Sequence, residues 1–320
     1  MCWPGLGNPM LDLIIDTDPG VDDVVALLLA MANPERLNLL AITTVAGNVP
    51  LAKTTRNACL AREWARRGDV PVYAGADRPL VRTPLYAEAI HGSEGLPDSV
   101  VHTPAEGAAS EHAVDYLVRT LEAAAPGSIT LAMLGPQTNL ALALRQSPAA
   151  ARGLKQVVIM GGAWFNPGNI TPLAEFNLFA DPHAAAEVLA SGLPLVYIPL
   201  DVTHKVLTSH DRLAEIRALG TRAGERVADV VASYISHDMQ RYGLPGGPVH
   251  DANVIAWLLN PGIYQGRAAD MAVVCEEGDA FGQTQPLEAG ASAEGQVNWI
   301  TDADSEGFFA LLKASLVRLP

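Results

Sequence analysis

Short apolar segments alternate with alanine-rich amphipathic segments along most of this chain, and this alternation limits the folds that it can adopt. Continuous apolar runs are typical of strands buried on both faces, and amphipathic segments are typical of helices that cover a sheet. The predicted strands are Leu11–Ile15, Leu37–Val45, Ser128–Leu134, Gln156–Met160 and Leu195–Pro199. The predicted helices between them are Asp22–Ala32, Leu51–Arg67, Glu111–Ala124, Asn139–Leu144 and Asp181–Ala190. This order predicts an α/β fold with a mostly parallel central sheet flanked by helices.

The pattern becomes mainly helical between about residues 205 and 260. The helices predicted there are Ala214–Leu219, Arg226–Arg241 and Ala252–Leu259. Because no repeat, low-complexity tract or long linker divides the chain, we expect residues 1–320 to form a single domain with this segment as its flank or lid. Ligands of open α/β sheets bind beyond the carboxyl ends of the strands, and the chemistry is therefore expected at that edge.

The charge and the cysteine content exclude several classes of partner. The chain has 35 Asp and Glu residues against 21 Lys and Arg residues, and its net charge of −14 repels nucleic acid and anionic membranes. Its longest apolar run, Val24–Ala32, is far shorter than the roughly 20 residues of a membrane span. The N-terminus does not resemble a signal peptide, and the three cysteines are too widely spaced for a disulfide framework or a metal-type pair. We expect a cytoplasmic protein that binds a neutral small molecule or a cation.

Four carboxylates follow the first predicted strand within eight residues: Asp16, Asp18, Asp22 and Asp23. One or two of them could cap the helix that begins here, but capping does not account for four. Carboxylates this close raise one another's pKa unless a cation compensates, and oxygen ligands suit Ca²⁺ or Mg²⁺. A Mg²⁺-dependent phosphatase also begins with a strand followed by Asp-x-Asp, although it usually has a threonine where this chain has Gly20. The cluster therefore indicates a hard-cation site, with helix capping and a phosphatase as alternatives.

Eight short motifs, in order, resemble those of the inosine–uridine preferring nucleoside hydrolases, particularly the bacterial pyrimidine-preferring members. The first is the acidic cluster itself, Asp-Thr-Asp-Pro-Gly-Val-Asp-Asp. The others are 44–48 (TVAGN), 91–96 (HGSEGL), 135–139 (GPQTN), 160–163 (MGGA), 168–169 (GN), 174–177 (AEFN) and 249–251 (VHD). The resemblance extends from about residue 11 to residue 260. It implies the family's Rossmann-like core and the cleavage of a nucleoside into a free base and ribose.

The resemblance also implies a bound Ca²⁺. Its ligands would be Asp18, Asp23, Asp251 and the backbone carbonyl of Leu134, and these three carboxylates and one carbonyl agree with the oxygen shell that Ca²⁺ prefers. Asp18 would additionally accept a proton from the water that attacks the anomeric carbon, because a cation makes that water more acidic.

The resemblance also implies a set of substrate-binding residues. Asp22 would bind the ribose 2′-hydroxyl, and the remaining contacts are implied for Asn48, Met160, Asn169, Glu175, Phe176 and Asn177. Met160 is expected to pack beneath the sugar. The segment 175–177 has an equally simple alternative interpretation as a helix cap, since Asp181-Pro182 soon follows.

The leaving base needs a proton or a hydrogen bond, and histidine supplies either near neutral pH. His250 adjoins the implied metal ligand Asp251, and His91 lies in a glycine-flanked loop, so both are candidates. Tyr242 would contact the base if residues 234–249 formed a mobile flap, the alternative being an ordinary helix-to-loop connection. The aromatic residues of the loop 164–167 either reach the base or cover the sheet edge. His204 lies in a family-like string without an assigned role.

These observations together predict a Ca²⁺-dependent ribonucleoside hydrolase that favours uridine and cytidine and that forms a homodimer or homotetramer. A purine-preferring or broad-specificity hydrolase is the alternative within the same class. Outside it, a phosphatase would need a basic phosphate-binding residue near the later strand ends, and a phosphorylase would need an anion site, but basic residues are sparse there. A non-catalytic nucleoside-binding protein would bind without turnover.

Overall fold

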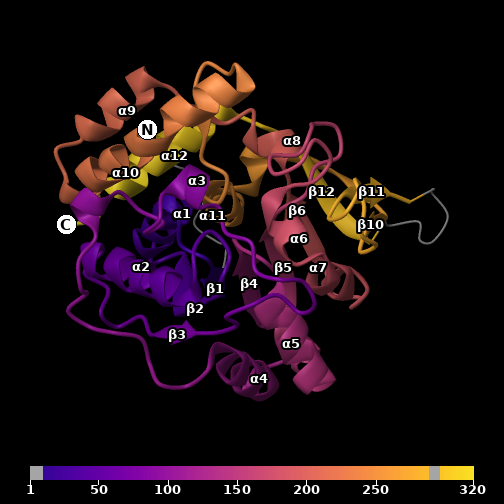
Figure 1. Ribbon diagram of the computed structural model, residues 1–320. Coiled ribbons are helices and arrows are strands. Elements are labelled where there is room, and N and C mark those ends of the chain that lie inside the picture. Colours follow the sequence, from indigo (N-terminus) through magenta and orange to yellow (C-terminus); the bar gives the residue numbers. More distant parts are fainter. Residues whose placement is uncertain (1–9, 288–295) are drawn as a thin grey trace.

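A computed structural model of the chain, which describes residues 10–287 and 296–320, has an eight-stranded central sheet (Figure 1). The strand order is β3-β2-β1-β4-β5-β6-β12-β9. The strands are β1 (Leu11–Thr17), β2 (Leu37–Thr44), β3 (Val72–Ala74), β4 (Ile129–Met133), β5 (Leu154–Met160), β6 (Leu195–Ile198), β9 (Tyr264–Ala269) and β12 (Val297–Ala303). Neighbouring strands pair in parallel except β9, which is antiparallel to β12 at one edge. The predicted fold class is therefore confirmed.

Apolar side chains of the strands enter two cores, one on each face of the sheet. Along β1, Leu13 and Ile15 belong to one core and Ile14 to the other, as the two-residue period of a strand requires. The first core is covered by α1 (Val21–Met31), α2 (Leu51–Trp64), α10 (Arg222–Tyr242), α11 (Ala252–Leu259) and α12 (Ser305–Leu316). The second is covered by α4 (Ala113–Ala123), α5 (Thr138–Gln146) and α7 (Pro182–Leu189). Figure 1 shows α4 and α5 at the opposite end of the molecule from α10 and α12.

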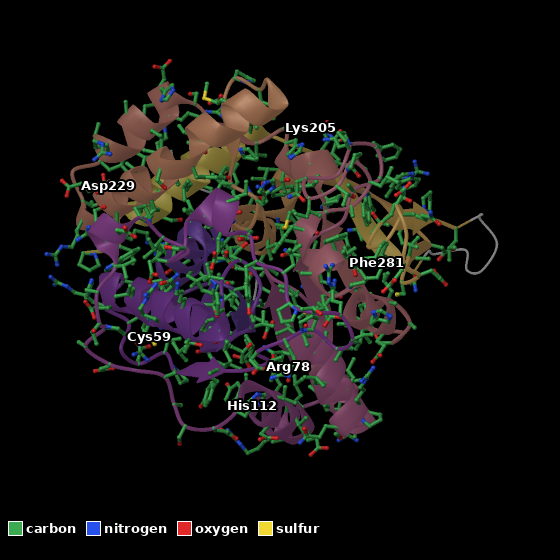
Figure 2. All side chains as sticks on the ribbon, viewed as in Figure 1. Cys59, Arg78, His112, Lys205, Asp229 and Phe281 are labelled. Carbon is green, nitrogen blue, oxygen red and sulfur yellow. The ribbon has the colours of Figure 1, made fainter. Side chains whose placement is uncertain are left out.

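Shorter elements connect this framework. They are α3 (Glu88–His91), α6 (Phe176–Ala180), α8 (Leu200–Thr203), α9 (His210–Arg217) and the antiparallel pairs β7 (Leu207–Thr208) with β8 (Gly247–Pro248) and β10 (Met271–Val273) with β11 (Thr284–Pro286). The predicted helical segment of residues 205–260 is thus formed by α9, α10 and α11. Among the side chains labelled in Figure 2, those of Arg78 and Asp229 are exposed to solvent, whereas that of Cys59 is buried.

The structure extends two of the five predicted strands, shortens the other three by one or two residues, and adds further strands. The strand β1 continues through Asp16 and Thr17, which are polar yet fully buried, and hydrophobicity alone therefore ends it too early. The strands β9 and β12 were missed because polar residues interrupt their apolar runs: Gln265 and Arg267 in the edge strand β9, and Asn298, Thr301 and Asp302 in β12. Within the described part of the chain, every helix is too short or too polar to span a lipid bilayer.

Candidate active site

A cavity lies where the carboxyl ends of β1, β2, β4 and β5 meet, the edge at which parallel sheets bind their ligands. Eleven of the residues predicted from the sequence line it: Asp22, Asn48, His91, Leu134, Met160, Asn169, Glu175, Phe176, Asn177, His250 and Asp251. Asp18 and Asp23 are fully buried next to it. The topology therefore brings together residues that are as much as 233 positions apart, from Asp18 to Asp251.

The turn between β1 and α1 holds Asp23 by four hydrogen bonds. The Thr17 hydroxyl donates to its Oδ1 at 2.5 Å, and the backbone N–H of Gly20 donates to its Oδ2 at 2.9 Å. The Asp18 N–H and the Asn48 side-chain amide donate at 3.3 and 3.1 Å. Asp23 thus caps α1, as the simpler interpretation expected, but its neighbours Asp18 and Asp22 are not used in that cap.

Asp18 lies between two glycines that follow other strands. A Cβ on Gly47 would be 2.1 Å from its Oδ2, and a Cβ on Gly135 would be 2.3 Å from its Oδ1. The Asn48 N–H donates to Oδ2 at 2.7 Å, whereas the buried Oδ1 has no hydrogen-bond partner among the described residues. The glycines of the TVAGN and GPQTN motifs are therefore required by the close approach of their loops to this carboxylate.

The acidic residues form a compact, buried cluster. Asp22, Asp23 and Asp251 each place a carboxylate oxygen within 4.8 Å of the others. Burial raises the pKa of Asp251 well above its ordinary value, and the charges of Asp22, Asp23 and Asp18 raise it further. Burial also raises the pKa of Asp22 to about 6, although backbone N–H groups of His250 and Asp251 hydrogen bond to it. Negative charges gathered in this way are stabilised by a cation.

The residues present fit a hard divalent cation. The buried Oδ1 of Asp18 has no hydrogen-bond partner within residues 10–287 and 296–320, and three further carboxylates converge beside it. The trio within 4.8 Å contains Asp22 where the sequence predicted Asp18, and Asp18 is close enough that its charge raises the pKa of Asp251. The Leu134 carbonyl accepts a hydrogen bond from the Asn177 side chain at 2.7 Å. The predicted set of Asp18, Asp23, Asp251 and Leu134 remains a proposal.

Glu175, which also lines the cavity, caps the short helix α6. Its carboxylate accepts hydrogen bonds from the backbone N–H groups of Asn177 (2.9 Å), Gly162 (3.1 Å) and Leu178 (3.3 Å). Burial outweighs these bonds and raises its pKa to about 7. Glu175 therefore both caps a helix and lines the cavity. Its position is compatible with either interpretation of segment 175–177, as a helix cap or as a substrate-binding site.

Amide side chains connect this wall to the strands. Asn177 donates from Nδ2 to the carbonyls of Leu134 and Met160, at 2.7 and 3.2 Å. Asn169 accepts the Phe176 N–H at Oδ1, at 2.8 Å. These bonds hold polar groups at the cavity in fixed positions, and the buried Met160 lines the same cavity.

Both candidate histidines are in place at the cavity. The Val21 N–H donates to His91 Nδ1 at 3.2 Å, and burial lowers the pKa of His91 to about 4, with Asp23 opposing that shift. His250 Nδ1 lies 2.8 Å from the Thr203 hydroxyl. Burial and the neighbouring histidines 204 and 91 hold the pKa of His250 well below its usual range. Both rings are therefore neutral near pH 7.

Several cavity residues have no counterpart in the sequence prediction. They are Tyr86, Ala87, Ala89, Ile90, Ile170 and Tyr234. Tyr234 lies on α10 and stacks with His91 at 6.2 Å between ring centroids, in the segment for which Tyr242 was predicted. The side chain of Tyr242 lies outside the described part of the structure. Helical periodicity places Tyr234 on the buried face of α10, but no local signal identifies what that face meets.

The loop of residues 164–167 covers the sheet edge. Trp164 packs edge-on against Trp299 of β12, and neither Trp164 nor Phe165 lines the cavity. The buried Asp201 accepts the N–H groups of Trp164, Phe165 and Asn166, and the Trp299 indole N–H at 2.8 Å. Trp164 also contacts Arg267 of the edge strand β9, so this loop lies on the sheet near its edge, as the second interpretation expected. Asp201, which was not singled out, anchors it.

The fold and the buried acidic site define the class of protein. The solved structure of a plant nucleoside hydrolase, PpNRh1, superposes with a TM-score of 0.89, at 29% identity over 97% of this chain and 99% of that one. A purine-preferring ribonucleoside hydrolase from Gardnerella vaginalis superposes with a TM-score of 0.88, at 28% identity over 96% and 99%. The chain therefore has the architecture of the ribonucleoside hydrolases, which are enzymes.

Sequence comparison then identifies the family. The model of the inosine-uridine preferring nucleoside hydrolases matches residues 13–310, and the chain belongs to this family. The protein C1683.06c of Schizosaccharomyces pombe is 43% identical over 312 residues, which cover 97% of this chain and all of that one. The pyrimidine-specific ribonucleoside hydrolase RihB of Shigella sonnei is 41% identical over 281 residues, covering 87% and 88%. The predicted family and enzyme class are confirmed.

Proposed function

We propose that this ribonucleoside hydrolase depends on Ca²⁺ and favours uridine and cytidine. The observation that carries the base preference is the 41% identity to pyrimidine-specific enzymes. The structural similarity to a purine-preferring hydrolase, at 28% identity, makes a purine-preferring or broad enzyme the alternative. The metal proposal rests on the four buried carboxylates and their raised pKa values.

The cation would be held by Asp18, Asp23, Asp251 and the Leu134 carbonyl, with Asp22 beside them. When bound, Ca²⁺ would act as a Lewis acid toward water and the ribose hydroxyls. An oxygen-only donor set of this kind favours Ca²⁺ or Mg²⁺ over the transition metals, which prefer nitrogen or sulfur ligands.

The chain's own residues would carry the proton transfers. Asp18 accepts a proton at Oδ1, which has no partner in the described part of the chain, as the water oxygen bonds to the anomeric carbon. The bond from that carbon to the base nitrogen breaks, and its electron pair leaves with the base. Asp22 holds the 2′-hydroxyl, and Asn48, Asn169, Glu175 and Asn177 hold the rest of the ribose above Met160. His250 and His91 donate hydrogen bonds to the base, which stabilise the charge that it gains on leaving, and Phe176 packs against the base.

The proposal is tested by analysing products chromatographically. The purified protein is incubated with uridine, cytidine, inosine and adenosine, each with added Ca²⁺ or with a chelator. We expect free uracil and cytosine to appear fastest, and only when Ca²⁺ is present. Faster release of hypoxanthine or adenine would contradict the pyrimidine preference, and full activity in chelator would contradict the metal dependence. Binding without any released base would make this chain a nucleoside-binding protein.

A separate prediction concerns the threonine behind His250. We propose that the Thr203 hydroxyl donates to Nδ1 and so keeps the ring proton on Nε2, from which it can hydrogen bond to the leaving base. Thr203→Val is expected to lower kcat for uridine by about tenfold, as when a hydrogen bond to a buried group is lost. A riboside with a p-nitrophenolate leaving group needs no such hydrogen bond, and its kcat is expected to stay unchanged.

Two variants control for this change. Thr203→Ser keeps the hydroxyl and is expected to keep kcat. Thr208→Val removes another buried threonine hydroxyl, one without a hydrogen-bond partner among the described residues, and should also be neutral. An equal loss on both substrates would show that Thr203 acts on the fold or the sugar site instead.

The remaining expectations are also proposals. We propose a cytoplasmic enzyme that assembles as a homodimer or homotetramer. We further propose that residues 1–320 form one domain, which is supported by the participation of strands from Leu11 to Ala303 in a single sheet.

A further inference from the structure

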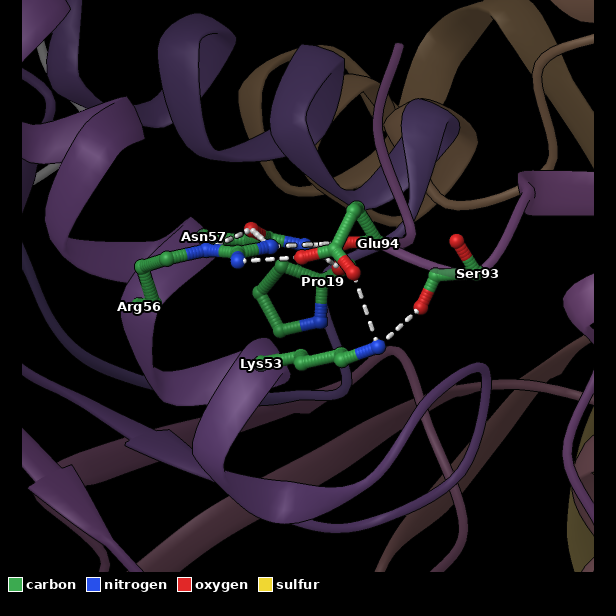
Figure 3. A network of polar contacts seen from close by, with 6 residues as sticks. All are labelled: Pro19, Lys53, Arg56, Asn57, Ser93 and Glu94. Atoms are coloured by element: carbon green, nitrogen blue, oxygen red, sulfur yellow. Dashed lines mark hydrogen bonds and ion pairs between the residues drawn. The ribbon is translucent and has the colours of Figure 1, made fainter. Parts of the chain in front are cut away.

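One face of α2 holds the loop that follows His91, as Figure 3 shows. Lys53, Arg56 and Asn57 are spaced by three and four residues, so they lie on the same side of that helix. All three contact the loop of residues 92–95 through Ser93 or Glu94. None of them lines the cavity.

The Glu94 carboxylate forms ion pairs with both cations. Lys53 Nζ lies 2.9 Å from Oε1, and Arg56 lies 2.5 Å from Oε2. Lys53 also donates to the Ser93 carbonyl at 2.7 Å, and Arg56 to the Glu94 carbonyl at 2.9 Å. The side chains are only 22–31% exposed, so salt and water screen these pairs less than fully exposed ones.

Asn57 joins this loop to the turn that carries the acidic cluster. Its fully buried side-chain amide donates to the carbonyls of Pro19 and Glu94, both at 2.9 Å, and its Oδ1 accepts from Arg56. Gly95 has a φ of +74°, and a Cβ there would be 2.9 Å from the Asn57 nitrogen. The loop therefore lies directly against the β1–α1 turn.

The same contact places His91. Its ring accepts the Val21 N–H, and a Cβ on Gly20 would be 2.6 Å from His91 Nδ1. The cavity wall formed by residues 86–91 thus depends on how the following loop is held against that turn.

We propose that Glu94, Lys53, Arg56 and Asn57 form a latch that positions the wall of residues 86–91 and thereby sets the affinity for the base. These are positioning residues, since they act through His91 and its neighbours. The inference rests on the proposed function, in which that wall contacts the base and the acidic cluster serves the ribose. The latch therefore affects recognition of the base and leaves recognition of the sugar intact.

The test compares Glu94→Gln with a matched control, Glu111→Gln, which removes a carboxylate paired with Arg119 on the surface near α4. We expect Glu94→Gln to raise KM for the preferred nucleoside about 3- to 10-fold, the loss expected when partly buried ion pairs are weakened. Inhibition by ribose, which lacks a base, is expected to stay within about twofold of wild type. Glu111→Gln should leave both values unchanged. Equal changes in KM and in ribose inhibition, or no change in either, would overturn the proposal.

Two further measurements separate the latch from the proposed function. In a His91→Ala background, Glu94→Gln is expected to add little further loss of kcat/KM if it acts through that residue, whereas full additivity would count against it. Amide hydrogen exchange over residues 84–95 should become faster in Glu94→Gln and not in Glu111→Gln, and unchanged exchange would overturn the latch. If wild type releases no base from any nucleoside, the proposed function fails, and the exchange result still decides whether the latch exists.

Discussion

Asp18→Asn is expected to lower kcat for nucleoside hydrolysis by about 10²- to 10⁴-fold, the range for loss of a general base. Asp18 is fully buried, its Oδ2 is held by the Asn48 N–H, and its Oδ1 is unpaired among the described residues. Asparagine preserves the size of the side chain but cannot accept the proton. Steady-state kinetics at saturating Ca²⁺ separates this loss from weakened metal binding.

The matched control for this variant is Asp115→Asn, which neutralises a carboxylate on the exposed face of α4. It should leave kcat within about twofold of wild type, as expected for an exposed charge remote from the site. A loss of less than tenfold in Asp18→Asn would contradict the role of Asp18 as base.

The position of this carboxylate can be tested separately from its chemistry. Gly47→Ala places a Cβ 2.1 Å from Asp18 Oδ2, so the carboxylate or the loop must move. Displacements of about 1 Å in an active site cost on the order of 10²-fold in rate. Gly107→Ala is the control, because a Cβ there has no atom within 4 Å. Equal activity of the two alanine variants would show that the close approach is not needed.

Adding Ca²⁺ to chelator-treated protein is expected to raise Tm, by about 5 °C at a hundred times Kd. Binding at that concentration stabilises the folded state by about 2.7 kcal/mol, and each kcal/mol raises Tm by about 2 °C in a chain of this size. The physical reason is the repulsion among Asp18, Asp22, Asp23 and Asp251, which a cation relieves. Differential scanning calorimetry measures the shift.

The direction of the pH dependence follows from the raised pKa values. Folding favours the protonated form of Asp22, because burial raises its pKa from 3.8 to about 6. The stability that this proton contributes is fully present below pH 3.8 and is lost as the pH rises through about 6. Burial raises the pKa of Asp16 and Glu175 to about 7, which extends the loss in the same direction. Metal-free protein is therefore expected to lose stability from pH 5 to pH 8. Ca²⁺ requires ionised ligands, so its effect on Tm should grow over the same range.

Asp251→Asn provides the matched variant for that experiment. It removes one ligand and one of the repelling charges, so in chelator at pH 8 it is expected to melt higher than wild type. Its Tm should also respond less to Ca²⁺. A Ca²⁺-induced shift that is equal at pH 5 and pH 8, or absent at both, would contradict a metal site built from these carboxylates.

Local sequence was sufficient to predict the strand–helix order and the acidic turn. Leu13 and Ile15 enter one core and Ile14 the other, because successive side chains of a strand point to opposite faces. The local backbone sets this alternation, whatever packs around the strand. The sequence also identified the glycines of the motifs. The steric reason for them is given by the structure, in which Gly47 and Gly135 approach Asp18 closely. Polar residues misled the prediction where they are buried within a strand, as Asp16 and Thr17 are.

The composition of the cavity wall depended on contacts that no local pattern contains. Tyr234 faces His91 because α10 packs over α3, and Trp164 covers Trp299 because Asp201 holds its loop. Asn57 bridges carbonyls that lie 38 and 37 residues away from it. None of these partners is determined by the period of hydrophobic residues or by the spacing of a motif.

By itself, the sequence determined the fold class, the family, the presence of an acidic cluster and most of the residues around the cavity. It could do so because backbone periodicity and the chemistry of short motifs act over a few residues. Only the tertiary structure decided that Asp22 joins Asp23 and Asp251 within 4.8 Å, that Tyr234 forms the wall beside His91, and that α2 holds the loop behind it. Those contacts arise when packing brings distant strand ends and helix faces to one edge of the sheet.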